Sequence, residues 1–320
     1  MPNPSNEVAV PDNVTVLGAG LMGHGIAQVF ATAGSRVRVW DPSAAALASL
    51  HQRVRENIEL LVSHGVRLPT ASDDIIDRIE AHDDLASAVA AAGLIFEAAP
   101  ESLELKRRLL ADVDRLNDQA VVASNTSVLR INDIAAGNPG ARRLIGTHWW
   151  NPPYLIPIVE VIPGTETAPA ITAAVIEWLE AVGKTAILVR KDVPGFIGNR
   201  LQFALWREAM QLVEDGVCDA QSVDTVARNT FGLRLSSMGP IENADFIGLD
   251  LVQAIMNYVL PDLAINGGAP VLVDDAVAEG RLGAKAGEGI LSWHSGARSE
   301  AQERLVAGIL RSLTAGEPIG

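Results

Sequence analysis

A glycine-rich turn near the start of the chain strongly limits what this sequence can fold into. The apolar run Val14–Leu17 leads directly into three glycines, Gly18, Gly20 and Gly23, and apolar residues at helical spacing follow over Ile26–Ala33. In a strand–turn–helix of this kind, the first glycine allows the tight turn and the second lets a pyrophosphate approach the backbone. The third lets the helix pack closely on the strand, and the phosphates lie at the positive end of the helix. A tight turn without a ligand is the alternative interpretation.

An acidic residue ends the second expected strand. The strand Val37–Trp40 is followed by Asp41, which lies 23 residues beyond the first glycine. A carboxylate at this position can accept both ribose hydroxyls of a dinucleotide, and it repels a 2′-phosphate. No arginine follows directly, so the sequence predicts NAD rather than NADP, bound by Asp41 and by the glycine turn with its Leu21 and Met22. Capping of the helix that opens at Pro42 is an alternative role for Asp41, and it is compatible with ribose binding.

Strand and helix signals alternate through the first part of the chain and then change. Short β-branched runs, separated by helical spacing, lie at Val14–Leu17, Val37–Trp40, Leu94–Phe96, Val121–Ala123, Leu144–His148, Ile158–Ile162 and Ala186–Val189. This alternation predicts an α/β fold with a Rossmann-like, doubly wound, mostly parallel sheet. After Pro194 the apolar residues recur at helical spacing, in Phe196–Glu214, Ala220–Thr230, Ile241–Leu260, Val271–Glu279 and Gln302–Leu313. We therefore expect an NAD-binding domain over residues 1–193 and a smaller, all-helical substrate and dimerisation domain over 194–320.

Charge and composition exclude several classes of partner. The 320 residues include 25 Lys and Arg against 39 Asp and Glu, a net charge of −14. This balance argues against nucleic acid or an anionic membrane as the main partner, because both need a basic face. The single cysteine, Cys218, excludes an internal disulfide framework and a thiolate metal cluster, and we expect no metal. Without a visible secretory signal or a membrane-spanning run, a cytoplasmic protein acting on a small molecule is expected.

A second functional signal runs from His148 to Glu160. His148 ends an expected strand, a turn containing Asn151 follows, and Glu160 lies on the returning strand. This strand–turn–strand segment could bring the carboxylate of Glu160 beside the imidazole of His148. A carboxylate there fixes the imidazole tautomer that a general base facing a hydroxyl requires. The spacing alone leaves a second possibility open, namely a buried histidine that is satisfied by a backbone carbonyl.

Several motifs in the same order resemble the 3-hydroxyacyl-CoA dehydrogenase family. They are GAGLMGHGIAQ, SNTS at 124–127, HWWNPP at 148–153, the Glu160 strand, KDVPGFIGNR at 191–200 and KAGEGIL at 285–291. The resemblance extends from about Val14 to Trp293. It implies a homodimeric enzyme that interconverts an L-3-hydroxyacyl-CoA and the 3-ketoacyl-CoA by hydride transfer with NAD.

The resemblance also implies roles for catalytic residues. The general base falls on His148 and its carboxylate partner on Glu160. The serine that contacts the substrate hydroxyl falls on Ser127, and the substrate-orienting asparagine falls on Asn199. A turn serine and a helix N-cap are the alternatives for Ser127 and Asn199.

Four further positions are candidate binding residues. Asn151 matches the asparagine that follows the family's catalytic histidine, and it is expected near the substrate. Glu101 and Lys106 match residues that contact the NAD ribose. Arg234, in FGLR, could bind a free carboxylate through a bidentate fork, although a solvated arginine at a helix end is an equally simple interpretation.

Three departures from the family pattern bear on the substrate. Trp149 and Trp150 replace the usual pair of phenylalanines. The lysine and arginine residues of segment 43–66 are just Arg53 and Arg55, whereas members that use CoA tend to place several lysines there. Other segments are similar to the L-gulonate 3-dehydrogenase (lambda-crystallin) and carnitine dehydrogenase relatives. A free 3-hydroxy acid is therefore an alternative to a CoA thioester, and a non-catalytic binding or structural protein is a third possibility.

Overall fold

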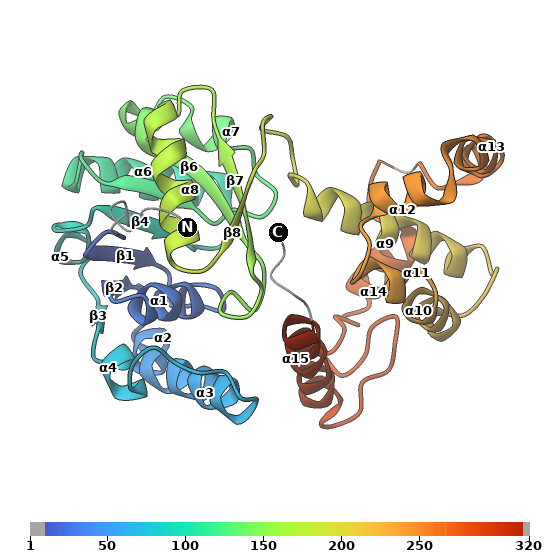
Figure 1. Cartoon of the computed structure of the whole chain (residues 1–320), viewed down its shortest axis with the longest axis horizontal. Coiled ribbons are helices and arrows are strands. Elements are labelled where there is room, and N and C mark those ends of the chain that lie inside the picture. Colours follow the sequence, from blue (N-terminus) through green and yellow to red (C-terminus); the bar gives the residue numbers. More distant parts are fainter. Residues whose placement is uncertain (1–9, 266, 316–320) are drawn as a thin grey trace, which may run out of the picture. The chain divides into compact units, whose positions relative to one another are not determined.

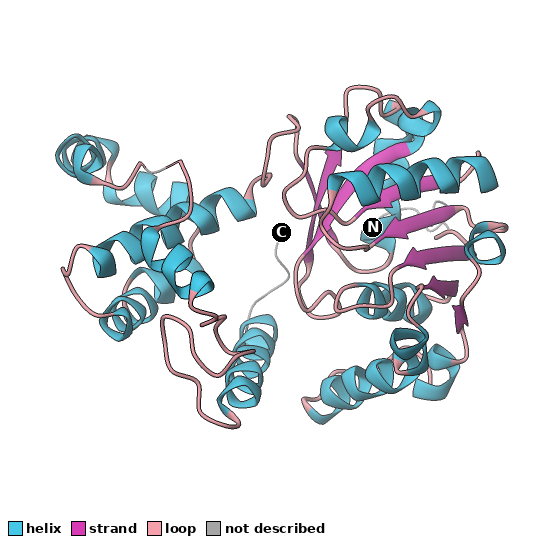
Figure 2. Cartoon of the chain, turned by 180° about the vertical axis from the view of Figure 1, so that it is seen from behind, coloured by secondary structure: helices cyan, strands magenta, loops and turns pink. Residues whose placement is uncertain are grey.

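The chain divides into two compact units, residues 1–200 and 201–320, in a computed structural model that describes residues 10–265 and 267–315 (Figure 1). The first unit is built around one eight-stranded sheet, and the second consists of helices and connecting loops (Figure 2). The strands are β1 (Asn13–Leu17), β2 (Arg36–Trp40), β3 (Ile79–His82), β4 (Leu94–Glu97), β5 (Val121–Ser124), β6 (Leu144–Trp149), β7 (Ile158–Pro163) and β8 (Thr185–Leu188).

The sheet has the strand order β3–β2–β1–β4–β5–β6–β7–β8. Neighbouring strands are parallel except for β6 and β7, which are antiparallel. This topology confirms the predicted Rossmann-like, mostly parallel fold. The strand order changes direction at β1, which lies between β2 and β4. In such a sheet, ligands bind in the crevice outside the carboxyl ends of the strands at the point of reversal.

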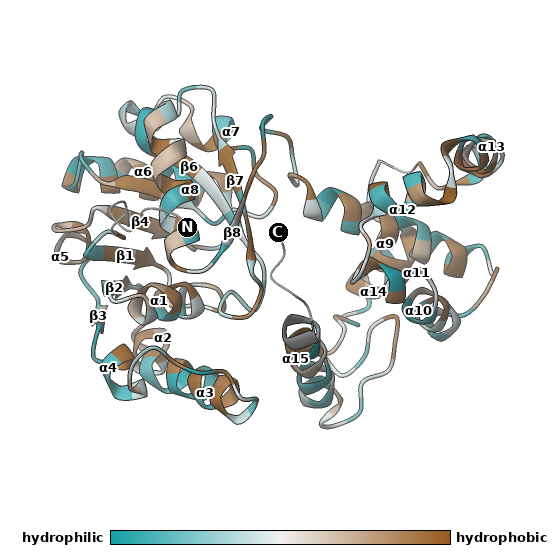
Figure 3. Ribbon diagram, viewed as in Figure 1, coloured by the Kyte–Doolittle hydropathy of each residue, from teal (hydrophilic) through white to brown (hydrophobic). Residues whose placement is uncertain are grey.

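Helices cover both faces of the sheet. Within β1, Val14 and Val16 belong to one buried cluster, whereas Leu17 belongs to the other. The first cluster includes side chains of α1 (Gly23–Thr32), α3 (Leu50–Ser63) and α8 (Pro169–Ala181), and the second includes those of α6 (Leu103–Leu116) and α7 (Ile131–Ala135). A strand buried on both faces is apolar at most positions, which is why β1 is mostly hydrophobic (Figure 3), apart from Asn13 and Thr15. The shorter helices of this unit are α2 (Ala44–Ala48), α4 (Ser72–Ile76), α5 (Leu85–Val89) and the 3₁₀ turn η1 (Pro139–Arg143).

The second unit is helical, and α9 (Gly198–Glu214) leads into it. Its other helices are α10 (Ala220–Asn229), α11 (Phe231–Leu235), α12 (Pro240–Ile247), α13 (Leu249–Val259), η2 (Leu260–Asp262), α14 (Val271–Ala278) and α15 (Ala297–Ala315). Many of its large apolar side chains are exposed in the single chain, among them Ile241, Phe246 and Tyr258.

The structure differs from the sequence-based expectations at two places. A single helix was expected over Ile241–Leu260, but Gly248, with a φ of +105°, separates α12 from α13. A left-handed backbone cannot continue an α-helix, so the chain changes direction there. Strand β3 was not expected, because its sequence IEAH holds just one fully buried residue, Ile79. A short strand at the sheet edge does not need the apolar pattern on which the prediction depends.

Candidate active site

The glycine turn between β1 and α1 has the geometry that its sequence predicts. Gly18 has a φ of +111°, and a Cβ added to it would lie 2.6 Å from the carbonyl oxygen of Ala98. A Cβ on Gly23 would lie 1.7 Å from the carbonyl oxygen of Gly18, so helix and turn can pack this closely only with glycine. A Cβ on Gly20 would meet no atom within 4 Å. Gly20 therefore borders open space, where a bound group can approach the backbone.

The residues around this open space fit a dinucleotide. Leu21 is largely exposed, Met22 is half-buried, and the N–H groups of both make no hydrogen bond to another described residue. Free N–H groups at the start of a helix are suitable donors to phosphate oxygens. The cradle at Gly20 and these donors thus match the pyrophosphate of NAD.

Asp41 lies beside the same turn. Its Oδ2 accepts a hydrogen bond from the Ala19 N–H at 2.8 Å, and its Oδ1 accepts one from the Ser43 N–H at 2.8 Å. Each carboxylate oxygen keeps a second lone pair, so the half-buried Asp41 can still accept ribose hydroxyls. The next helix begins at Ala44, and Ser43 is its N-cap. The expectation that this helix opens at Pro42 with Asp41 as its cap is therefore wrong.

Sequence analysis did not single out Arg53 as part of the turn. Its guanidinium donates to the carbonyl oxygens of Gly20 at 3.3 Å and Ala46 at 2.9 Å. His24 also bonds to the Gly20 carbonyl oxygen, at 2.8 Å, and burial lowers the pKa of this imidazole. Gly20 and Arg53 are 33 positions apart in the sequence, so no local signal could have revealed the contact.

His148 and Glu160 are directly opposite each other on the antiparallel strands β6 and β7. The Nδ1 of His148 lies 2.7 Å from Oε2 of Glu160, and both side chains are almost fully buried. The Oε1 of Glu160 accepts hydrogen bonds from the N–H groups of Ile197 at 2.8 Å and Gly198 at 3.1 Å. Burial would raise the pKa of Glu160, but the hydrogen bonds from His148 and from these two N–H groups outweigh it and lower the pKa. Glu160 is therefore a carboxylate that holds the proton of His148 on Nδ1.

The two tryptophans after His148 occupy different environments. Trp149 is buried in the core, with its ring 6.3 Å from Phe30 and 5.8 Å from Phe96 between centroids. Trp150 is half-buried, and its ring lies 4.9 Å from the imidazole. A Cβ on Gly198 would lie 2.2 Å from the Trp150 ring, so this indole packs directly on the glycine. Trp150 therefore forms one wall beside the His148 imidazole, whereas Trp149 packs in the core.

Ser127 and Asn199 are brought together by a hydrogen bond. The Asn199 side chain is buried, and its Nδ2 donates to the carbonyl oxygen of Ser127 at 2.8 Å. The Ser127 hydroxyl is half-buried and has no hydrogen-bond partner within the described ranges. Because Asn199 directly follows Gly198, which bonds to Glu160, the four expected catalytic residues belong to one connected network. The hydroxyl remains available to a ligand.

Glu101 and Lys106 have other partners than a ribose in this structure. The Oε1 of Glu101 accepts from the Thr126 hydroxyl and from the N–H groups of Ser127 and Val128. The side chain of Lys106 has no exposed surface, and its ammonium pairs with carboxylates. Contact of Lys106 with the NAD ribose stays a prediction, and it would require the side chain to become uncovered.

Two candidate substrate residues are exposed. Asn151 is exposed and its side chain makes no hydrogen bond to any described residue. Arg234 belongs to the second unit, where its guanidinium has no ion pair or hydrogen bond with the described residues. It borders a cavity of about 300 Å³, lined by Leu233, Arg234, Ser237, Met238, Asn243, Phe246 and Ile247. This cavity combines one cation, a hydroxyl and an amide with an apolar wall.

The doubly wound sheet and the glycine turn define a dinucleotide-binding α/β protein, and comparison with known proteins identifies its family. Residues 13–193 match the model of the 3-hydroxyacyl-CoA dehydrogenase, NAD binding domain, and residues 195–293 match that of the 3-hydroxyacyl-CoA dehydrogenase, C-terminal domain. The chain belongs to the 3-hydroxyacyl-CoA dehydrogenase family. It is an NAD-dependent oxidoreductase of this family, whose members act on 3-hydroxyacyl-CoA or on hydroxy acids.

Two relatives and one solved structure are similar to this chain. The chain is 33% identical over 282 residues to a 5-formyl-3-hydroxy-2-methylpyridine 4-carboxylate 5-dehydrogenase of Mesorhizobium japonicum, covering 88% of this chain and 90% of the relative. It is 40% identical over 235 residues to an L-carnitine dehydrogenase of Streptomyces coelicolor, covering 72% and 73%. A solved structure of a 5-formyl-3-hydroxy-2-methylpyridine 4-carboxylic acid 5-dehydrogenase, described as an NAD+ dependent dismutase, has a TM-score of 0.88 at 31% identity. The match covers 96% of this chain and 99% of the chain in that structure. No helix among the described residues is long and apolar enough to cross a membrane.

Proposed function

We propose that the chain oxidises the 3-hydroxyl of a small free hydroxy acid to a ketone, with NAD as hydride acceptor and His148 as general base. The buried His148–Glu160 pair carries this proposal, because the carboxylate at Nδ1 fixes the imidazole tautomer whose lone pair is on Nε2. Only this nitrogen remains to accept the proton of a substrate hydroxyl. The carboxylate of Glu160 then stabilises the imidazolium that forms, as general base catalysis requires.

Two further residues complete the proposed reaction. The free hydroxyl of Ser127 can donate a hydrogen bond to the substrate oxygen, and Asn199 fixes the Ser127 backbone. When bound, NAD supplies the electron sink that accepts the hydride from C3. The hydroxyl proton goes to His148, so one hydride and one proton leave the alcohol and a ketone remains. Ile197 and Gly198 support this geometry, since their N–H groups prevent Glu160 from turning away from the imidazole.

The choice of a free acid over a CoA thioester rests on the basic residues. Arg53 is bound to backbone carbonyls at the glycine turn, and Arg55 pairs with Asp73 at 3.0 Å, so neither is free for CoA phosphates. Arg234 has no ion pair among the described residues, and it borders a cavity that also holds a hydroxyl and an amide, which suits a carboxylate. The relatives named for a pyridine carboxylate and for L-carnitine support the same class. The CoA thioester remains the second candidate, which the family's own description favours.

The experiment is a parallel assay of NADH formation. Carnitine, gulonate and 3-hydroxybutyrate would be compared with 3-hydroxybutyryl-CoA, each with NAD, and acetoacetyl-CoA would test the reverse direction with NADH. We expect kcat/KM to be at least tenfold higher for one of the free acids than for the thioester. A higher value for the thioester would overturn the free-acid assignment. NADH binding without turnover of any of these compounds would favour the binding or structural alternative.

We also propose the domain roles and the assembly. Residues 1–193 would bind NAD through Gly18, Gly20, Leu21, Met22, Gly23, Asp41, Glu101 and Lys106, and residues 194–320 would contribute to substrate binding and form a homodimer. Exposed apolar side chains of the helical unit, such as Ile241 and Phe246, support self-association, because contiguous apolar surface marks interfaces. Light scattering at micromolar concentration should return the mass of a dimer, and a monomer would contradict the proposal.

A further inference from the structure

A buried cluster of charges lies where the carboxyl end of β4 meets α6. The Lys106 ammonium donates to Oε1 of Glu97 at 2.8 Å and to the Ala99 carbonyl oxygen at 3.2 Å. It also pairs with Oε2 of Glu101 at 3.3 Å. The Lys106 side chain has no exposed surface, and that of Glu97 is 6% exposed. Burying an ion pair costs desolvation energy that its mutual attraction seldom exceeds, so stability alone is a weak reason for this arrangement.

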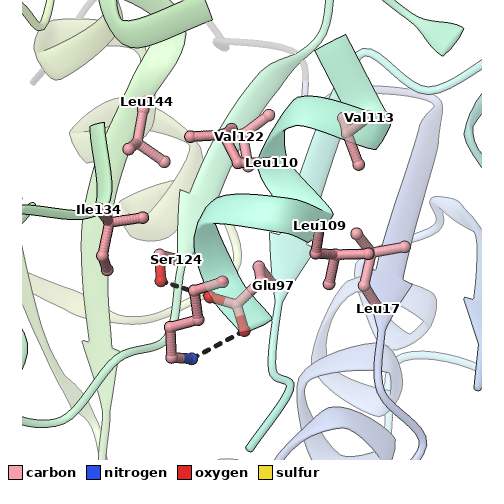
Figure 4. A pocket seen from close by; sticks show the side chains of 10 residues that line it. Leu17, Glu97, Leu109, Leu110, Val113, Val122, Ser124, Ile134 and Leu144 are labelled. Atoms are coloured by element: carbon pink, nitrogen blue, oxygen red, sulfur yellow. Dashed lines mark hydrogen bonds and ion pairs between the residues drawn. The ribbon is translucent and has the colours of Figure 1, made fainter. Parts of the chain in front are cut away.

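The space within the cluster is too small for a ligand. The cavity beside it measures about 10 Å³ and is otherwise walled by apolar side chains, as Figure 4 shows. That volume barely holds one water molecule. Figure 4 also shows Glu97 bonded to Ser124, whose hydroxyl donates to Oε2 at 2.5 Å. Glu97 additionally accepts the Ala99 N–H at 2.8 Å. The buried pair Glu97 and Lys106 therefore has no room for a bound molecule in this cavity.

Glu101 connects the cluster to the loop that carries Ser127. Its Oε1 accepts from the Thr126 hydroxyl at 2.5 Å and from the N–H groups of Ser127 at 2.9 Å and Val128 at 3.0 Å. Burial would raise the pKa of Glu101, but the Thr126 and Val128 hydrogen bonds and the charge of Lys106 lower it. An ionised carboxylate is the stronger acceptor for these three donors.

The same loop is tied to the histidine strand and to Asn199. Asn125 Oδ1 accepts the N–H of Trp149, the residue after His148, at 3.0 Å. Asn199 Nδ2 donates to the Ser127 carbonyl oxygen at 2.8 Å. Each residue from 124 to 128 thus makes a hydrogen bond outside this segment. The bonds of residues 124 and 126–128 include ones to the carboxylate oxygens of Glu97 or Glu101. Ser127 is the member whose hydroxyl remains free.

We propose that Lys106 and Glu97 are positioning residues, which hold Glu101 oriented so that it fixes the Ser127 loop for the substrate. This inference rests on the proposed function where it assigns Ser127 to the substrate hydroxyl. Lys106 then affects turnover through the position of Glu101, separately from any contact with the NAD ribose. Glu97 matters because it places Lys106 and bonds to Ser124 at the start of the loop.

The central test is Lys106→Met. Without the cation, Oε2 of Glu101 loses its ion pair, and this side chain, which is 33% exposed, can turn toward solvent. Once turned, Glu101 no longer accepts the Ser127 and Val128 N–H groups. We expect kcat to fall about 10- to 100-fold, as small displacements of substrate-positioning groups do. Hydrogen–deuterium exchange of the 125–129 peptide, measured without NADH, should accelerate at least tenfold.

Three further variants separate this role from others. Lys106→Met with Glu97→Gln leaves no unpaired buried carboxylate and should fold, but Glu101 still lacks its cation, so kcat should stay as low as in Lys106→Met. Glu97→Gln alone should lower kcat less than fivefold. Arg115→Met, an exposed basic residue on the same helix, is the control and should change neither exchange nor kcat.

Each outcome decides the proposal. Loss of NADH affinity at unchanged kcat in Lys106→Met would assign the residue to the ribose and overturn the inference, as would unchanged exchange at 125–129. If Lys106→Met does not fold, the double variant decides: fast exchange at 125–129 with lowered kcat supports the proposal, and slow exchange refutes it. Exchange and NADH binding need no substrate. They therefore remain informative even if the unaltered protein turns over none of the tested acids, which would refute the proposed function alone.

Discussion

Glu160→Gln is the most revealing single change, because the backbone dictates how the new amide must lie. Oε1 of Glu160 accepts two N–H groups, from Ile197 and Gly198, so the amide oxygen of glutamine has to occupy this position. The amide nitrogen then faces Nδ1 of His148 in place of Oε2, at a site where the two atoms are 2.7 Å apart. A nitrogen that carries hydrogens there can only donate. His148 is thereby driven to the other neutral tautomer, with its proton on Nε2.

The size of the effect follows from this tautomer. With Nε2 already protonated, the imidazole cannot accept the substrate proton, and general base catalysis is worth about 10² to 10⁴ in rate. The comparable loss in triad hydrolases, where an asparagine imposes the wrong tautomer, is about 10⁴. We therefore expect kcat to fall by about 10³ to 10⁴. Stability should fall by just about 1–3 kcal/mol, the contribution of one charge-assisted hydrogen bond, because both backbone N–H bonds persist.

The assay combines turnover, melting temperature and NADH affinity. Glu166→Gln is a matched control, because Glu166 is an exposed carboxylate without a partner among the described residues. NADH affinity should be unchanged in both variants, and Glu166→Gln should keep full activity. A Glu160→Gln protein with kcat within threefold of the unaltered enzyme would refute the tautomer argument. Equal losses of NADH affinity and melting temperature would instead show that Glu160 has a structural role alone.

The same variant tests a dependence of stability on pH. The folded-state pKa of Glu160 lies below its ordinary value of 4.5, so its ionisation favours folding. This contribution is fully present above pH 4.5 and is lost as the pH falls through the lower, folded-state pKa. Urea unfolding at pH 7, 4 and 3 should therefore show the stability difference between the unaltered protein and Glu160→Gln shrinking with acid. A difference that is constant over this range would contradict the prediction.

Four other changes have defined outcomes. Asp41→Ala should weaken NAD binding with little change in melting temperature, and comparable kcat/KM for NADP in the unaltered protein would contradict the assigned NAD preference. His148→Gln should lower kcat by about 10² to 10⁴ at constant NADH affinity, and a fully active variant would end the proposed mechanism. Burial lowers the pKa of Lys184 to about 8, so the unfolded chain binds more protons between pH 8 and 10.5 and stability should rise there by up to about 3 kcal/mol. Lys184→Met should lack this rise in urea unfolding. Gly198→Ala should displace the Trp150 ring, lowering kcat while indole fluorescence shifts, and an unchanged spectrum would count against this packing.

The sequence predicted those parts of the molecule whose signal is local. The glycine turn, the strand that ends at Asp41 and the excursion from His148 to Glu160 each lie within about 25 residues. Turn geometry and strand alternation act over such distances, so residue types and spacing suffice to locate them. The catalytic roles themselves remain predictions, since geometry alone does not measure a reaction.

Contacts between distant segments were not predictable in the same way. Glu97 and Ser124 end neighbouring strands and meet because the sheet places β4 beside β5, which no motif in the sequence encodes. Arg53 reaches the glycine turn from α3 in a similar manner. The sequence also assigned Lys106 to the cofactor, whereas its burial is a property of how α6 packs on the sheet. Packing decides these positions, and it is visible only once the elements are assembled.

The cross-strand position of His148 and Glu160 has a consequence for how this chain acquires activity. The two residues form one rung of the β6–β7 ladder, so their alignment is set when these two strands pair in register. A slip by one residue would move one side chain to the opposite face of the sheet and leave the imidazole without its carboxylate. Recovery of activity during refolding should therefore report when this pairing becomes native, even if bulk helix content has already returned. An insertion or deletion within either strand would also change this register and separate the two residues.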